Sequence, residues 1–286
     1  MGSEMCIRDS TSRLSEDMES IIDELLTGTG AVAIRGAFDA DEVAEARSLI
    51  MEFSKDVDKE THFQGANEET IHLQRRVWNL LAKGKIFEAM VQHPAIVEIS
   101  SAFLGNKFHL GSIAANRLLP GGPGQEPHID YPYWDMYDRA GFPARINSSF
   151  PMNLQVTIPL DPFNEVSGAS GFLPGSQVDL RYPETDDRDH FYANCARMSG
   201  DPGDAILFNG MVWHCAMPNH SDHDRSAILI EYLPKFIIPL EDQLSGVPQE
   251  VIDRGTPIFK QLVGVDRPYP KLFDEAAGKN TIGRDA

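Results

Sequence analysis

The sequence predicts a mainly β protein whose core is flanked by helices. From position 108 onwards, apolar residues come in short runs separated by Pro and Gly clusters, which is typical of many short strands joined by turns. Helical periodicity is confined to the part of the chain before that point. Strands and helices do not alternate, and no Gly-rich phosphate-binding motif is present. These features indicate a β core with a helical jacket rather than a doubly wound α/β fold.

The N-terminal part predicts four helices and one strand. The expected helices cover residues 15–27, a stretch from Asp39 or Asp41 to about residue 53, 86–93 and 95–104. Ser15 is a suitable N-cap for the first helix, and two glycines follow its end. The apolar run 31–34 is of strand type, and the polar stretch 55–75 is expected to be an irregular loop.

The remainder of the chain predicts the strands of the core. They are expected at residues 108–119, 152–160, 171–173, 204–209, 211–214 and 226–233. The acidic stretch 182–190 is expected to be a surface loop. Residues 1–10 show no helical or strand periodicity, and we interpret them as a non-native or disordered leader. We expect 11–286 to form one domain, with its core at about 105–235 and a C-terminal extension at 236–286.

The chain is strongly acidic, with a formal net charge of −18 over 286 residues. Such a chain repels polyanions, so nucleic acid and anionic membrane surfaces are not expected partners. No apolar run reaches the roughly 18 residues of a membrane-spanning helix. Three cysteines in no disulfide or zinc spacing favour a reducing, cytoplasmic location. The expected partner is a small-molecule substrate, and the chain is expected to be a monomer or a homodimer.

The segment 126–130 contains a His-x-Asp pair. In an extended segment, residues i and i+2 point to the same side, so His128 and Asp130 can offer a nitrogen and an oxygen to one metal ion. The alternative is a His–Asp hydrogen bond at the surface. A second histidine, His214, ends an apolar run directly after Trp213. The alternative to a metal-binding role for His214 is a buried histidine that forms a hydrogen bond with a backbone carbonyl.

Arg225 precedes an otherwise apolar strand. Arginine is the side chain best suited to bind a carboxylate through two hydrogen bonds. The alternatives are a residue at the edge of the strand or an ion pair with Asp222 or Asp224. Two histidines and one carboxylate on one face of an octahedral iron(II) leave positions open for a co-substrate and O₂. A structural zinc site would instead use four protein ligands.

These residues resemble the iron motif of the phytanoyl-CoA dioxygenase family in its broad sense. That motif is a His-x-Asp pair, a distal His, and an Arg eleven residues after the distal His; the matching residues are His128, Asp130, His214 and Arg225. Further similarity lies at 30–43, 93–105, 168–177 and 214–225, so the resemblance covers about 28–235. Two positions depart from the family pattern: Ala216 stands where Ser is frequent, and Thr157 where Trp is frequent.

The resemblance implies a double-stranded β-helix, a jelly roll of the cupin type. It implies that His128, Asp130 and His214 bind Fe(II). It also implies 2-oxoglutarate as co-substrate, bound by Arg225 and more weakly by Thr157, with O₂ as oxidant and ascorbate as a supporting reductant. The implied reaction hydroxylates a C–H bond of a small organic substrate and releases succinate and CO₂.

The substrate pocket is less well defined by the sequence. The candidates for substrate contacts are Asn116, Tyr131, Tyr133, Trp134 and Gln155. The three aromatic residues directly follow the iron motif. They either form an aromatic wall for the substrate or pack under a loop. Positions 153, 155 and 157 face one side of an expected strand, which favours the barrel interior for Gln155. Three further residues are expected either to meet an anionic substrate or to offset the acidic surface: Arg117, Arg139 and Arg145.

Two other classes of function remain open from the sequence. A metal-dependent hydrolase or isomerase of the cupin type would use the same three metal ligands, but it has no need of Arg225. A non-catalytic binding protein on the same fold would be free to lose the ligands, and here all three are present. The sequence does not specify the substrate.

Overall fold

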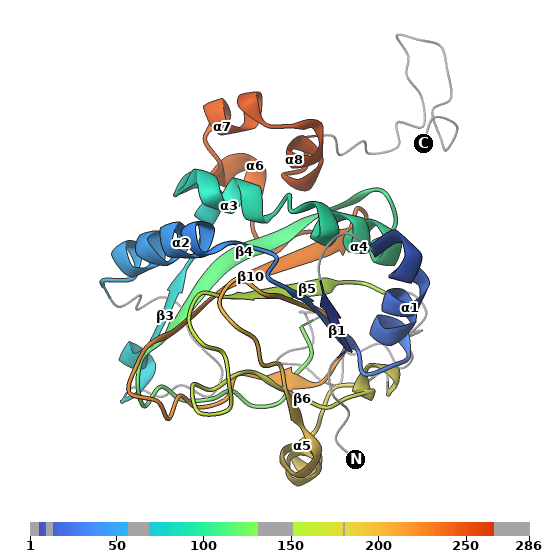
Figure 1. The fold of residues 1–286 in the computed structure, drawn as a ribbon, viewed down its shortest axis with the longest axis vertical. Coiled ribbons are helices and arrows are strands. Elements are labelled where there is room, and N and C mark those ends of the chain that lie inside the picture. Colours follow the sequence, from blue (N-terminus) through green and yellow to red (C-terminus); the bar gives the residue numbers. More distant parts are fainter. Residues whose placement is uncertain (1–5, 10–13, 57–68, 131–150, 180, 266–286) are drawn as a thin grey trace.

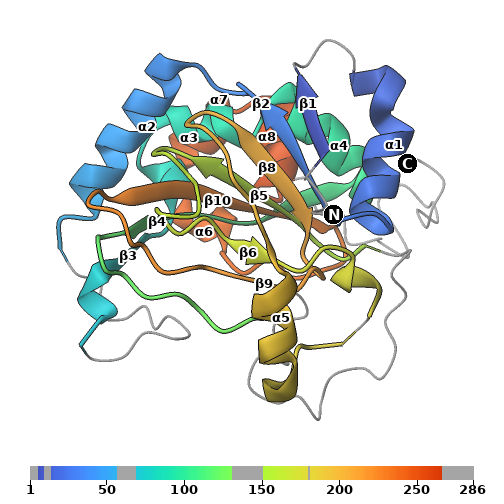
Figure 2. The same cartoon turned by 60° about the horizontal axis from the view of Figure 1, so that its bottom comes forward.

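Two β-sheets lie face to face in the computed structural model, which describes residues 6–9, 14–56, 69–130, 151–179 and 181–265 (Figures 1 and 2). The larger sheet has the spatial order β1 (Cys6–Asp9), β2 (Ala31–Arg35), β8 (Ala205–Asn209), β5 (Leu154–Pro159), β10 (Arg225–Pro234), β4 (Phe108–Leu118) and β3 (Gln74–Val77). The smaller sheet has the order β7 (Ala196–Arg197), β6 (Gly171–Phe172) and β9 (His214–Cys215). Among the described strands, only β1 and β2 pair in parallel. This is the predicted double-stranded β-helix core.

Helices cover the outer face of the larger sheet (Figure 1). They are α1 (Leu14–Leu26), α2 (Ala40–Phe53), α3 (Lys85–Met90), α4 (Pro94–Leu104), α6 (Gln243–Gly246), α7 (Gln249–Arg254) and α8 (Pro257–Leu262). Alternate strand residues point into this helical layer: on β10, Ile228 and Ile230 join its apolar core. Leu229 and Glu231 therefore point to the opposite side, which we call the inner face because it faces the smaller sheet.

A separate apolar cluster lies beyond the smaller sheet. Helix α5 (Arg188–Asn194) lies next to β9 (Figure 2). Its Phe191 packs with Trp213 and Cys215. In the described segments, four short 3₁₀ helices connect the elements: η2 (Ile71–Leu73), η3 (Leu80–Ala82), η6 (Ser176–Val178) and η7 (Thr185–Asp187). The smaller sheet is thus packed on both sides, and its inner side meets the larger sheet.

Local sequence signals explain where several helices begin. The Asp39 side chain accepts hydrogen bonds from the backbone amides of Asp41 and Glu42, and the Glu42 side chain accepts one from the backbone amide of Asp39. This capping box fixes the first turn of α2, as the sequence predicts. Pro94 stands in the first turn of α4, where its missing amide hydrogen costs nothing.

Four segments differ from the expectation. The stretch expected to be an irregular loop ends in strand β3, which begins at Gln74 and pairs with β4. The expected surface loop 182–190 contains η7 and the start of α5, because Glu184 and Asp187 form a capping box there. Cys6–Asp9, in the expected leader, forms edge strand β1 through backbone pairing, which requires no side-chain periodicity. Of the expected strand 211–214, only His214 is in a strand, because a turn closes at Val212 N.

The described part of the C-terminal extension completes the outer layer. Glu241 accepts the amide hydrogen of Ile113 at 2.7 Å and donates its own to Gly111 O at 2.9 Å, at the edge of β4 beyond the end of β3. Arg254 forms a two-pronged ion pair with Glu88 of α3, with Nη1 2.8 Å from Oε2. None of the helices in the described segments has the length and apolar character needed to cross a membrane.

Candidate active site

The two predicted histidine ligands are brought together by backbone pairing between distant segments. His128 N donates to His214 O, and His214 N donates to His128 O, both at 2.9 Å. This bridge lays segment 125–130 beside β9 and brings the two imidazole centroids to 4.6 Å. Asp130 N donates to Gly210 O at 3.0 Å. Asp130 then lies with one carboxylate oxygen 3.6 Å from His128 Nε2 and the other 3.2 Å from His214 Nε2.

Hydrogen bonds to the backbone orient both imidazoles for a metal ion. His128 Nδ1 lies 2.8 Å from Glu126 O, and His214 Nδ1 lies 2.9 Å from Val212 O. A carbonyl oxygen only accepts, so each Nδ1 carries a hydrogen, and Nε2 is the nitrogen of each ring that is left to bind a metal ion. One ligand atom from each residue of the triad lies within 4.8 Å of the others. The donor set therefore fits a divalent cation such as iron(II).

The electrostatics of the triad also favour a bound cation. Burial, together with the charge on His214, lowers the pKa of His128 to about 4, so this imidazole is neutral at physiological pH. Burial alone would raise the pKa of Asp130, but His214, His128 and Arg76 hold it below its ordinary value. Burial alone would lower the pKa of His214, but the Asp130 carboxylate raises it. A metal ion would take the place of the proton that His214 and Asp130 share.

The Gly-rich segment 168–177 supports the backbone around His214. Ser176 Oγ accepts the amide hydrogen of Trp213 at 2.8 Å, and Leu173 N donates to Trp213 O at 2.9 Å. Gly168 has a φ of +82°, and a Cβ there would overlap the carbonyl of Met217 on the chain that follows β9. Only glycine allows this close approach, which explains the glycine at this position.

Arg225 is a buried cation on the inner face of β10. It is 4% exposed, and within the described part of the chain its Nε and Nη2 have no hydrogen-bond partner. Its guanidinium lies 5.1 Å from the centroid of the Phe163 ring. Burial, together with the charge on Arg76, lowers the pKa of Arg225 to about 10, so it stays charged at neutral pH. Arg225 is therefore suited to receive an anion from outside the chain.

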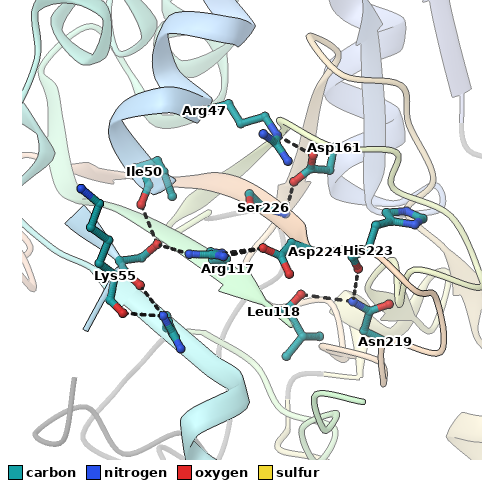
Figure 3. Close-up of polar contacts among 12 residues, drawn as sticks. Arg47, Ile50, Lys55, Arg117, Leu118, Asp161, Asn219, His223, Asp224 and Ser226 are labelled. Carbon is teal, nitrogen blue, oxygen red and sulfur yellow. Dashed lines mark hydrogen bonds and ion pairs between the residues drawn. The ribbon is translucent and has the colours of Figure 1, made fainter. Parts of the chain in front are cut away.

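The acidic residues near Arg225 have other partners. Asp224 forms an ion pair with Arg117 at 2.6 Å (Figure 3), and Asp222 contacts His223 at 3.2 Å. The alternative that Arg225 pairs with either aspartate is therefore wrong. Arg117 points to the helical side of the sheet, where it also donates to Ser54 Oγ at 3.2 Å, so of its two expected roles the structure favours the offset of acidic charge.

Hydrogen bonds and ion pairs hold the residues on either side of Arg225 in place (Figure 3 shows these neighbouring residues). Asp161 accepts from Arg47 at 2.7 Å and from the amide of Ser226 at 2.9 Å. Asn219 is fully buried, and its Nδ2 donates to Leu118 O at 3.1 Å and to His223 O at 2.9 Å. These bonds hold the start of β10 and the preceding loop against β4.

The other predicted residues are placed as follows. Thr157 and Gln155 lie on the inner face of β5, where their Cα partners on β10 are Leu229 and Glu231. Asn116 lies on the inner face of β4, and no described residue forms a hydrogen bond with its buried Oδ1. Five predicted residues lie outside the described residues: Tyr131, Tyr133, Trp134, Arg139 and Arg145.

Two charged residues on the inner face were missed by the sequence reasoning. Arg76 on β3 is the Cα partner of Asn116, and its charge lowers the pKa of both Asp130 and Arg225. Arg76 directly follows the expected loop 55–75, and no strand was expected to contain it, so the sequence did not indicate the side to which its side chain points. Glu231 had a signal, because it is the only charged residue within the apolar run 226–233.

Comparisons with known proteins agree with this geometry. The sequence profile of the phytanoyl-CoA dioxygenase (PhyH) family matches residues 27–227. Dioxygenase cdmA of Talaromyces verruculosus is 28% identical over 251 residues, which cover 84% of this chain and 81% of that protein. A probable alpha-ketoglutarate-dependent hypophosphite dioxygenase of Stutzerimonas stutzeri is 29% identical over 232 residues, covering 74% of this chain and 77% of that protein.

A solved structure shares the fold. The epimerase SnoN, in complex with Fe³⁺, alpha ketoglutarate and nogalamycin RO, superposes with a TM-score of 0.58 at 17% identity. The superposition covers 77% of this chain and 85% of SnoN. The family match spans most of the chain and includes the whole metal triad and Arg225. The chain therefore belongs to the phytanoyl-CoA dioxygenase family, and it is an enzyme of the non-haem iron- and 2-oxoglutarate-dependent class.

Proposed function

We propose that this protein hydroxylates a C–H bond of a small organic substrate and releases succinate and CO₂ from 2-oxoglutarate. The observation that carries the proposal is the convergence of one ligand atom each from His128, Asp130 and His214 within 4.8 Å, on imidazoles whose Nδ1 atoms are already engaged. Three protein ligands on one side leave the other positions of an octahedral ion for small molecules.

Each residue of the site has a distinct role in this proposal. His128, Asp130 and His214 would hold iron(II), which together with 2-oxoglutarate supplies the oxidising chemistry with O₂. Arg225 would bind the distal carboxylate of 2-oxoglutarate, because it is a buried guanidinium with unpartnered N–H groups. Thr157, which is 4% exposed on the same face, would add a weaker hydrogen bond.

The surrounding apolar side chains would keep water from the reacting atoms. The ring of Phe208 lies 4.9 Å from that of His214, and Phe163 lies beneath Arg225. Both belong to an apolar cluster between the two sheets that includes Val212 and Phe172. A dry site strengthens the interaction of Arg225 with a carboxylate and limits oxidation of anything other than the substrate.

The experiment measures co-substrate binding first and turnover second. We expect anaerobic addition of 2-oxoglutarate to the iron(II) protein to produce a visible metal-to-ligand charge-transfer band. Under air, the wild type is expected to form succinate, and His214→Ala to form none. His223→Ala, which removes an exposed histidine outside the triad, serves as the control and should keep wild-type turnover. A well-folded wild type that gives no band and no succinate would contradict the proposal.

The product identifies the reaction type. Once a substrate stimulates succinate release, ¹⁸O₂ is used, and the product is expected to carry one ¹⁸O atom in a new hydroxyl group. A product without added oxygen would exclude hydroxylation while leaving the assignment of the co-substrate intact.

A further inference from the structure

An apolar groove lies on the outer surface where α1 meets α4. It has a volume of about 620 Å³, and its walls include Met18 of α1 and both Val97 and Ala102 of α4. Met18 and Val97 pack against the main core on one side and line the groove on the other. Of the described residues that line the groove, Glu98 alone carries a charge. The groove therefore suits large apolar side chains of another segment, which would leave water there.

The described part of the chain ends next to this groove. Helices α8, α4 and α1 lie in a row, with α4 in the middle (Figures 1 and 2). Gln261 Nε2 of α8 donates to Asn106 O at 3.1 Å, and Asn106 lines the groove. Gly264, with a φ of +87°, follows α8 and turns the chain out of the helix. Residues 266–286 thus begin little more than one helical turn after the residue that bonds Asn106.

The first residues beyond the described part are apolar and basic. The segment 266–273 reads Asp-Arg-Pro-Tyr-Pro-Lys-Leu-Phe, and its two prolines favour an extended backbone. It contains Tyr269, Leu272 and Phe273, whereas 274–286 contains a single isoleucine as its large apolar residue. An extended chain spans up to about 23 Å in seven residues, and packed helices lie about 8–10 Å apart. Leu272 is therefore within reach of the groove on the far side of α4.

The charges of the segment match those around the groove. Arg267 and Lys271 stand within the apolar segment. Glu98 on the groove wall and Glu19 on the neighbouring face of α1 are both exposed. Exposed ion pairs contribute little affinity, but they favour one placement of a segment over others.

We propose that residues 266–273 bind in the groove of their own chain, with Leu272 and Phe273 against its apolar wall. A separate partner would have to bury about 800 Å² per molecule for a stable complex and would lose translational freedom. A segment that is tethered beside the groove has an effective concentration in the millimolar range, so a small apolar contact is sufficient. The groove lies on the outer layer, away from the metal triad, so this inference is independent of the proposed function.

Limited digestion of the whole chain with trypsin measures this binding. Trypsin cleaves after Lys271, inside the proposed bound segment, and after Lys279, beyond it. Each rate is divided by the rate for the same bond in a synthetic peptide 266–286, which removes the effect of local sequence. Cleavage requires the released segment, so we expect the bond after Lys271 to be cut at least about tenfold more slowly than the bond after Lys279 on this scale. Equal normalised rates in the wild type would overturn the proposal.

Two variants locate the contact. Ala102→Glu places a charge in the groove at an exposed helical position, and it should raise the normalised rate after Lys271 to that after Lys279. Ala193→Glu makes the same change at an exposed position of α5 and should keep the wild-type protection. Unchanged protection in Ala102→Glu would overturn the proposal. Protection that increases with protein concentration would mean that the groove receives the segment of a second copy, and it would overturn the assignment to the same chain.

Discussion

Replacement of Arg225 by Met is expected to make the metal-free protein more stable and at the same time unable to hold its co-substrate. The guanidinium is 4% exposed, two of its nitrogens have no hydrogen-bond partner among the described residues, and burial lowers its pKa from the ordinary arginine value to about 10. A shift of this size corresponds to about 3 kcal/mol of unfavourable free energy for the charged form. Methionine removes the charge and keeps apolar contact with Phe163. We therefore expect the free energy of unfolding to rise by about 1–3 kcal/mol.

The same change should weaken binding of 2-oxoglutarate. Truncating one partner of a buried, hydrogen-bonded charge pair costs about 2–5 kcal/mol, or about 30-fold to about 4,000-fold in Kd. Urea unfolding of the metal-free protein measures the first effect, and anaerobic titration of the charge-transfer band measures the second. Arg225→Lys keeps the charge but loses the two-pronged geometry, so we expect weaker binding with no gain in stability. An Arg225→Met protein that binds 2-oxoglutarate normally, or that is less stable than the wild type, would refute the reasoning.

Three further perturbations test the site and its supports. Gly210→Ala would drive a Cβ into Asn153 and displace the carbonyl that holds the metal carboxylate, so the Kd for iron(II) should rise about 10- to 100-fold; an unchanged Kd by titration would contradict this. Gly168→Ala combines a positive φ with an overlap of its Cβ on the backbone, whereas Gly105→Ala has a positive φ in open space. Gly168→Ala should therefore lower the free energy of unfolding by about 1–3 kcal/mol more than Gly105→Ala does. Equal losses of stability in urea unfolding would exclude the overlap. Iron(II) at about 100 times its Kd should stabilise the wild type by about 2.7 kcal/mol and leave His214→Ala unchanged, as thermal unfolding with and without metal will show.

The sequence predicted most of the architecture because its signals are local. The start of α2 after Asp39 depends on a capping box that spans four residues, and a strand such as β8 is an apolar run between Gly203 and Gly210. The elements that were missed have weak or distant signals. Strand β3 carries two arginines and becomes a strand only because β4 offers its edge, and β1 depends on pairing with β2.

The candidate site was predicted in part. The spacing of His128 and Asp130 places both on one side of an extended segment, as the structure shows, while His214 joins them only through the backbone bridge. The roles of the ligands, of Arg225 and of Thr157 stay predictions until metal and co-substrate binding are measured. The aromatic residues after the iron motif stay predictions as well, because they lie outside the described residues.

The sequence by itself determined the helices up to residue 104, most strands of the core, the family and the residue types of the metal triad, because periodicity and motif spacing can be read from the chain without its partners. Only the tertiary structure decided which charges are paired. Arg117 and Arg225 both lie beside Asp224, yet the register of β4 and β10 turns Arg117 to the helical side with that aspartate and Arg225 to the inner face without it. Glu231 likewise gained its position near the metal ligands from the pairing of β10 with β5. Side-chain partners depend on the register between distant strands, and that register is set by the packing of the whole sheet.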